Sequence, residues 1–450
     1  MTIKDRYENL KKHLEEESPI LLEVVQKYEI LDNIGYKTGF LQEEDSYTGS
    51  ISWWPIISML GTFSAGKSTF INNYLGAKVQ DSGNQAVDDK FTAVCYGHNE
   101  KITTLPGIAL NADPRFPFYG ISDEVNKIEA GEGDRINMYM QLRTVKSDNT
   151  RGKVVIDSPG FDADSQRDTI LRMTKHIIDI SDLVLIFFDA RHPEPGAMRD
   201  TLEHLVSTTM KHSDADKVLY ILNQIDTTAK EDNLEDVISS WQRSLAQKGL
   251  ITGNFYTIFN EESADTITDQ AIFDRLKQKK DFHLEKIINR IDEVSIERSY
   301  RIASMLSDIS KEYKNKKFPK LREALESWSK KVFLADSVVV LLMVSGLVAL
   351  ELQSGMISSS LVSMIATGVG SGIVFTYLHF VMRKIMAKVE IKKHKDDADL
   401  VRALKISTQW FKPIFSHKMK SWNSKNIKKL DELITHSKLT ISKLNDQFIN

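Results

Sequence analysis

Residues 61–68 read Gly-Thr-Phe-Ser-Ala-Gly-Lys-Ser, which is the pattern G-x-x-x-x-G-K-S. The apolar run 55–60 before it reads as a buried strand, and residues 69–75 after it read as the start of a helix. In a strand–loop–helix of this kind, glycines let the chain turn tightly so that backbone N–H groups converge on an anion. The pattern therefore predicts a phosphate-binding loop and, with it, an α/β fold.

The positions of this loop have distinct predicted roles. Lys67 is expected to reach the β- and γ-phosphates of a nucleoside triphosphate, and the Ser68 hydroxyl to ligate Mg²⁺. The residues expected to contact the nucleotide here are Gly61, Thr62, Phe63, Ser64, Ala65, Gly66, Lys67, Ser68 and Thr69.

Two later apolar runs end in polar motifs that suit the same site. Residues 154–156 lead into Asp157-Ser158-Pro159-Gly160, where Asp157 would orient the hydration shell of Mg²⁺ and the Gly160 N–H would sense the γ-phosphate. Residues 217–222 lead into Asn223-Gln224-Ile225-Asp226, which is N-Q-x-D. GTPases usually have N-K-x-D here, with the Asp accepting two hydrogen bonds from guanine. The Gln at 224 leaves the base selectivity open.

A further apolar run at 181–190 lies between these two motifs. Strands separated by helical patterns predict an α/β P-loop NTPase with a mostly parallel sheet and helices on both faces. Ligands of such sheets bind at the carboxyl ends of the strands, where all three motifs fall.

The composition sets limits on other classes of function. With 41% hydrophobic and 27% charged residues, the 450-residue chain is an ordinary globular mixture, long enough for two or three domains. The net charge of −3 provides no global field that favours nucleic acid, so we expect no nucleic-acid partner. The single cysteine, Cys95, excludes an internal disulfide and a thiolate metal cluster, and we expect it to be buried. Residues 1–6 lead into a charged helix without the apolar core of a secretion signal, so we expect the soluble part in the cytosol.

With these motifs assembled, the chain resembles the dynamin superfamily, and within it the EHD-type (Eps15-homology-domain) membrane-remodelling ATPases. The resemblance is carried by residues 59–71, by Phe188-Asp189-Ala190-Arg191-His192, and by residues 105–118, and it covers roughly 50–315. The segment 105–118 is similar to an EHD insert that ordinary small GTPases lack. The resemblance implies a dynamin-type GTPase domain, an Mg²⁺ cofactor, and a homodimer or higher homo-oligomer formed through the nucleotide-binding face. It also implies that Ser64 contacts the β–γ bridge region.

The sequence departs from the family at several positions. Phe63 occupies a position where dynamins carry a water-positioning Gln. A dynamin-like alignment makes Thr92 the threonine that completes the Mg²⁺ shell, whereas an EHD-like alignment places Asp88 there; we prefer Thr92, as a catalytic and metal-binding residue. No D-x-D-x-D-G loop occurs in the sequence, so we expect no EH domain. Asp226 favours GTP, but EHD proteins keep a similar motif and bind adenine, so ATP stays open.

Two uncharged runs, 337–350 and 352–382, predict a membrane-inserted hairpin over 332–382. Lys330 and Lys331 precede the hairpin and a basic cluster from Arg383 follows it, which predicts that the N- and C-terminal parts are cytosolic. Because the first run is short, two arrangements remain: two full spans, or a shallow re-entrant segment followed by one span.

The remaining apolar residues recur at helical spacing and complete the expected domain organisation. We expect an N-terminal helical segment (1–50), a dynamin-type GTPase domain (51–262), a helical stalk (263–331), the membrane hairpin (332–382) and a C-terminal helical segment (383–450). The predicted function is a membrane-anchored nucleoside triphosphatase that remodels, tethers or fuses membranes. The alternatives are a membrane-bound, nucleotide-dependent switch that recruits partners with little hydrolysis, and an EHD-like ATPase.

Overall fold

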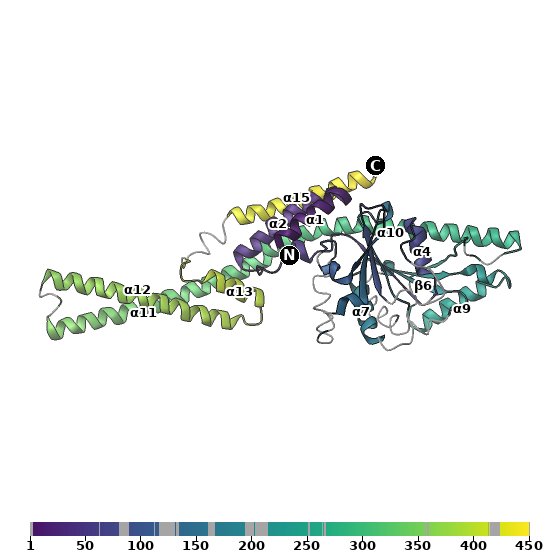
Figure 1. Cartoon of the computed structure of the whole chain (residues 1–450). Coiled ribbons are helices and arrows are strands. Elements are labelled where there is room, and N and C mark those ends of the chain that lie inside the picture. Colours follow the sequence, from purple (N-terminus) through teal and green to yellow (C-terminus); the bar gives the residue numbers. More distant parts are fainter. Residues whose placement is uncertain are drawn as a thin grey trace. The chain divides into compact units, whose positions relative to one another are not determined.

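The computed structural model describes most of the chain, in two compact units (Figure 1). The first unit comprises Met1–Leu22 and Gly49–Ile302, and the second comprises Glu23–Thr48 and Ala303–Asn450. The described residues are 3–62, 64–80, 90–111, 113–116, 131, 135–160, 167–193, 202, 215–250, 253–262, 264, 267–355, 357, 360–412, 414 and 424–449.

The first unit is built on an eight-stranded sheet with the order β3-β4-β2-β5-β1-β6-β7-β8. Its strands are β1 (Ile56–Gly61), β2 (Phe91–Tyr96), β3 (Thr103–Pro106), β4 (Met140–Val145), β5 (Val154–Asp157), β6 (Leu183–Asp189), β7 (Val218–Asn223) and β8 (Asn254–Thr257). All neighbouring strands are parallel except the pairs β2–β5 and β3–β4. The predicted α/β fold with a mostly parallel sheet is therefore confirmed.

Successive strand residues point to opposite sides of this sheet, so both of its faces carry apolar side chains, and helices cover both faces. Leu60, Ile186 and Leu222 pack in one core with residues of α7 (Arg167–Ile180) and α9 (Leu234–Gln247). Their neighbours Met59, Leu185 and Ile221 pack in a second core with α4 (Lys67–Leu75) and α10 (Gln270–Glu312). Strands buried on both faces explain the unbroken apolar runs in the sequence. Cys95 is fully buried in β2, as expected.

The N-terminal helix α1 (Ile3–Glu17) is fixed to the first unit by a buried carboxylate. The Glu17 side chain is 1% exposed and lies 3.7 Å from the Arg115 guanidinium. It accepts hydrogen bonds from the Trp54 indole N–H at 2.9 Å and from the Gly152 backbone N–H at 3.1 Å. A charge at this depth is tolerated only because it is paired and hydrogen-bonded.

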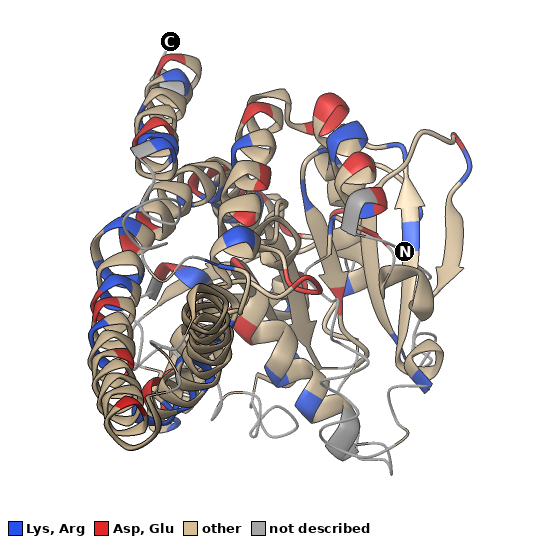
Figure 2. Ribbon diagram, turned by 90° about the vertical axis from the view of Figure 1, so that its left-hand side faces the viewer, with Lys and Arg blue, Asp and Glu red and all other residues tan. Residues whose placement is uncertain are grey.

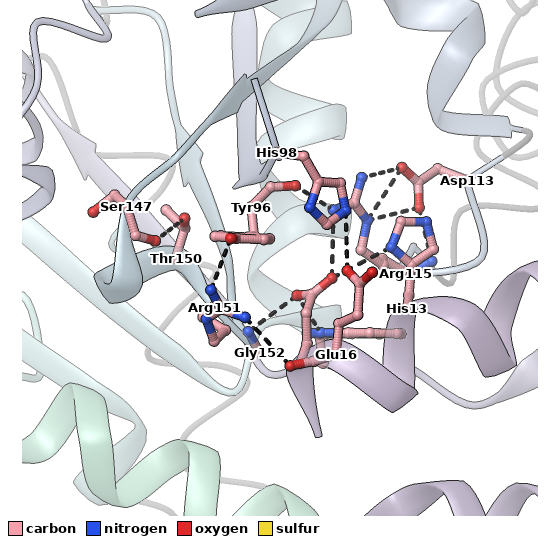
Figure 3. Close-up of polar contacts among 12 residues, drawn as sticks. His13, Glu16, Tyr96, His98, Asp113, Arg115, Ser147, Thr150, Arg151 and Gly152 are labelled. Carbon is pink, nitrogen blue, oxygen red and sulfur yellow. Dashed lines mark hydrogen bonds and ion pairs between the residues drawn. The ribbon is translucent and has the colours of Figure 1, made fainter. Parts of the chain in front are cut away.

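Arg115 is the centre of this polar cluster, and Figure 3 shows it beside Asp113. It donates to the Asp113 carboxylate at 2.6 Å and to the Tyr96 carbonyl oxygen at 2.8 Å. Burial acts to raise the pKa of Asp113, but the hydrogen bonds and charge of Arg115 more than offset it, so that the pKa lies below its usual value. Both residues belong to the segment 105–118. The described part of this EHD-like insert therefore holds α1 in place.

The second unit is helical. It contains part of α2 (Pro19–Thr38), the end of α10, a π-helical turn (Tyr313–Lys317), α11 (Phe318–Ser354), α12 (Leu361–Lys393), α13 (Ala398–Ser407) and α15 (Ser424–Ile449). Tyr313 lies at its aromatic centre, with ring centroids 5.6 Å from Phe40 and 5.7 Å from Phe318. Figure 2 shows Lys, Arg, Asp and Glu interspersed along the helices on the side that faces the viewer, consistent with the small net charge.

Helices α11 and α12 form an antiparallel hairpin (Figure 1). Trp328 donates its indole N–H to the Arg383 carbonyl at 3.3 Å, and the His379 ring lies 2.7 Å from the Asp336 carboxylate. In the charged part of the hairpin, the buried Glu390 side chain pairs with Lys331. Burial acts to raise the pKa of Glu390, but the hydrogen bond and charge of Lys331 help to hold it below its usual value.

Both helices of this hairpin are long and apolar enough to cross a membrane, by length and composition. Within their most apolar 18-residue windows, only 11% and 0% of the residues are buried. Helix α11 continues without a break to Ser354, so the short first run forms a helix long enough for the two-span arrangement.

We expect the substitution Arg115→Ala to lower the free energy of unfolding by about 3–5 kcal/mol, because it leaves the buried carboxylates of Glu17 and Asp113 without their counter-charge. The measurement is urea unfolding of the full chain in mild detergent, followed by circular dichroism.

The matched control is Lys11→Ala in the same α1 helix. Its ion pair with Glu8 is exposed, with N and O 3.2 Å apart. Loss of an exposed pair should cost less than about 1 kcal/mol. Equal effects of the two substitutions would show that the cluster does not anchor α1.

Candidate functional site

The predicted phosphate loop lies between β1 and α4, and both of its glycines are required by close contacts. A Cβ atom at Gly61 would lie 2.6 Å from the carbonyl oxygen of Phe187 in β6. A Cβ atom at Gly66 would lie 2.2 Å from the Asn223 amide nitrogen, and Gly66 has a φ of +84°, a conformation that side chains disfavour. Between them, Ala65 donates its N–H to the Thr62 carbonyl at 3.3 Å, while Phe63 lies outside the described residues.

The N-Q-x-D motif at the end of β7 braces this loop. Asn223 donates its amide to the Ala65 carbonyl at 2.9 Å, and Gln224 donates its amide to the Ser64 carbonyl at 2.5 Å. Ser64 and Gln224 both have positive φ, of 59° and 63°. Such strained residues persist only where surrounding contacts hold them, and they cluster at functional sites. The Gln224 amide, which could have packed on a base, is instead directed at the loop.

Lys67 is held inside the loop. Its ammonium donates to the carbonyl oxygens of Gly61 at 3.0 Å and Thr62 at 3.2 Å. Burial lowers the pKa of Lys67, and the negative charge of Asp157 opposes this shift. The Lys67 cation thus lies within the loop, where its charge suits a multiply charged anion.

The structure brings two of the predicted metal-binding residues together. The Ser68 hydroxyl lies 3.4 Å from one carboxylate oxygen of Asp157. Hydroxyl and carboxylate oxygens are the donors that Mg²⁺ prefers, completed by water and substrate phosphates. Within the described residues no group of three or more His, Cys, Asp or Glu could hold a metal ion. The assignment of Ser68 and Asp157 to Mg²⁺ stays a prediction.

Gln80 is a site residue that sequence reasoning missed. Its amide donates to the same Asp157 oxygen at 2.8 Å, and its side-chain oxygen accepts from Arg143 in β4. Asn72 in α4 fixes its backbone by two hydrogen bonds, one to the Gln80 carbonyl and one from the Gln80 N–H, each 2.8 Å long. No local motif marks Gln80, since only the pairing of distant strands brings Arg143 and Asp157 to it.

Thr92 and Gly160 have less direct relations to this cluster. Thr92 is buried in β2 opposite Asp157, and its hydroxyl accepts from the Gln141 amide at 2.8 Å. Gly160 ends the described segment 135–160, and the alternative Asp88 lies outside the described residues. The roles assigned to Thr92 and Gly160 stay predictions.

A cavity of about 310 Å³ adjoins the loop. It is lined by Gly66 and Asn223, by residues of α4, by the part of α10 from Lys280 to Ile288, and by residues 258–262, which follow β8. Asp226 is buried in the 3₁₀ turn Ile225–Thr228 after β7. The sequence did not predict strand β8, because residues 254–257 form only a short run. This strand brings a further segment to the carboxyl edge of the sheet, where ligands bind.

Comparisons with known proteins agree with this geometry. Residues 57–225 match the Dynamin family. EH domain-containing protein 1 of Homo sapiens is 27% identical over 185 residues, which cover 38% of this chain and 31% of that protein. EH domain-containing protein 2 of Rattus norvegicus is 26% identical over 182 residues, which cover 38% and 30% of the two chains. The chain thus matches less than a third of the length of these relatives.

Solved structures give a more distant similarity. An oligomerised bacterial dynamin pair, described as a mechanism for long-range sensing and tethering of membranes, is 16% identical with a TM-score of 0.37, over 99% of this chain and 80% of that one. Era in complex with MgGDPNP and ribosomal RNA is 16% identical with a TM-score of 0.27, over 50% and 56% of the two chains. The sequence matches place residues 57–225, which carry the motifs at the sheet edge, in the Dynamin family, and this part of the chain is similar to the EH domain-containing proteins.

Proposed function

We propose that this protein is a membrane-anchored, dynamin-like nucleoside triphosphatase that favours GTP and couples hydrolysis of the γ-phosphate to membrane remodelling, tethering or fusion. The observation that carries the proposal is that one chain combines a braced phosphate loop with a hairpin whose apolar surface is left exposed. Monomeric soluble proteins rarely expose apolar surface of this extent.

Each residue of the site has its own proposed role in hydrolysis. The loop N–H groups and Lys67 bind the β- and γ-phosphates, and Ser64 lies at the β–γ bridge. Ser68 and Thr92 would hold Mg²⁺, Asp157 would orient its hydration shell, and the bound cation would offset the phosphate charge. Gln80 keeps the Asp157 carboxylate directed at Ser68, and Gly160 responds to the γ-phosphate. Phosphoryl transfer of this kind depends mainly on positioning and electrostatics.

The preference for guanine rests on Asp226. Its carboxylate can accept two hydrogen bonds from the N–H groups of a guanine edge, and adenine offers no matching pair of donors. Because Gln224 is engaged with the loop, Asp226 is the residue of the motif left to select the base.

The hairpin is proposed as the membrane anchor. An 18-residue helical window is about 27 Å long, close to the roughly 30 Å of a bilayer core. Basic residues at both outer ends of the hairpin support a topology with the N- and C-terminal parts in the cytosol. A homodimer or higher homo-oligomer formed through the nucleotide-binding face would complete the site, and release of the γ-phosphate would relax the loops beside it.

The substitution Gly66→Ala should abolish nucleotide binding, because the added Cβ collides with Asn223 and the residue has a left-handed φ. Titration of fluorescent GTP and ATP analogues measures this. The matched control is Gly76→Ala at the end of α4, which also has positive φ but has no atom within 4 Å of the added Cβ. The control should keep full affinity, at a cost of roughly 1 kcal/mol or more in stability. Tight binding by the Gly66 variant would contradict the loop assignment.

The substitution Asp226→Asn should weaken GTP roughly 10- to 100-fold, since hydrogen bonds to a charged group contribute about 1.5–3 kcal/mol. ATP affinity should change little. Isothermal titration with both nucleotides measures the two constants. If both nucleotides weaken equally, Asp226 does not select the base.

Vesicles of phosphatidylcholine and phosphatidylglycerol should stimulate hydrolysis by the full chain and change shape in electron micrographs. A variant with residues 332–382 replaced by a short Gly-Ser linker should keep basal hydrolysis, lose the stimulation and no longer float with vesicles. Hydrolysis that lipid does not stimulate, with vesicles unchanged in shape, would instead favour a membrane-bound switch that recruits partners.

A further inference from the structure

Two aromatic side chains at the foot of the hairpin have no role in the function proposed above. Trp410 and Phe411 follow α13, and they are 74% and 62% exposed. Their rings contact each other edge to face, with centroids 5.9 Å apart. Large aromatic rings contribute strongly to burial energy, so a pair left in solvent indicates a surface that is covered in use.

A buried arginine fixes the backbone that carries these rings. Arg383, which is 7% exposed, donates to the carbonyl oxygens of Gln409 and Trp410, each at 3.3 Å, and also to that of Lys412. The guanidinium carbon lies 5.5 Å from the centre of the Trp328 ring. Charge-assisted hydrogen bonds to three carbonyls hold the turn 409–412 against α12 at Arg383.

The turn lies at the boundary between the apolar and charged parts of the hairpin. The Trp410 ring packs edge-on against Phe380, with centroids 6.4 Å apart, and Phe380 is three positions before Arg383, the first charged residue after the uncharged run. At the same level the side chains of Asp336 and His379 meet across the two helices.

We propose that Trp410 and Phe411 form a second membrane contact, in which both rings enter the headgroup region of the bilayer that takes up the hairpin. This inference rests on the proposed function of the hairpin. Aromatic rings, and Trp above all, favour the membrane–water interface, where an apolar body and a polar edge are both satisfied. Lys412 belongs to the turn, and Lys384 and Lys388 follow Arg383 in α12; these three cations suit anionic headgroups. The turn would set how deeply the hairpin inserts.

The test uses the full chain with an environment-sensitive fluorophore at a single cysteine. Cys95 is fully buried, so a cysteine introduced on the surface is labelled selectively. The variants are Trp410→Cys and Phe411→Cys in the turn, Val344→Cys in the exposed face of α11, and Leu439→Cys on the surface of α15 as a soluble control. Each is mixed with vesicles of phosphatidylcholine and phosphatidylglycerol that carry nitroxides near the headgroup or deep in the acyl chains.

The expected result is a shift to shorter emission wavelength at 410, 411 and 344, and none at 439. Headgroup-level nitroxides should quench the probes at 410 and 411 more than deep ones, and the probe at 344 should show the reverse order. A shift at 344 without any at 410 and 411 would overturn this inference and leave the membrane anchor intact. No shift at any position would overturn both.

Discussion

The close approach of Gly66 to the Asn223 amide is the constraint on which the nucleotide site depends. It joins the phosphate loop after β1 to the end of β7, two strands away in the sheet. The hydrogen bonds from Asn223 and Gln224 to Ala65 and Ser64 then hold the loop in a strained conformation. Because these contacts are made within the protein, the loop is organised before any phosphate binds, and binding energy is not spent on ordering it.

A second set of contacts organises the side of the loop where metal binding is proposed. Asp157 receives the Gln80 amide and lies beside Ser68, and Gln80 in turn depends on Arg143 and Asn72. A ligating carboxylate that is itself hydrogen-bonded has a defined direction, and such outer partners strongly affect metal affinity. Residues of β4, α4 and β5 together thus support the proposed Mg²⁺ site.

The two units handle polar and apolar groups in opposite ways. In the first unit, the carboxylates of Glu17 and Asp113 are buried beside Arg115, whose positive charge pairs with both. In the second unit, the hairpin exposes apolar side chains instead. Burial of charge costs free energy unless it is paired, whereas exposure of apolar surface costs free energy in water but not in lipid. Paired buried charges in the first unit and exposed apolar side chains in the second agree with the proposed catalytic unit in water and anchor in a bilayer.

Local patterns in the sequence determined the loop, the apolar strands and the position of the apolar hairpin. These features depend on residues close together in the chain, such as Gly61 to Ser68, so spacing and periodicity suffice to predict them. Contacts between residues distant in sequence were decided by the tertiary structure alone. They include the Gln80–Asp157 bond, the turn of the Gln224 amide onto the loop, the buried place of Thr92 in β2, the Arg115–Glu17 anchor and the packing of Trp410 on Phe380. Each arises where the sheet order or the hairpin brings separate segments together, and no periodicity within one segment encodes which partner it will meet.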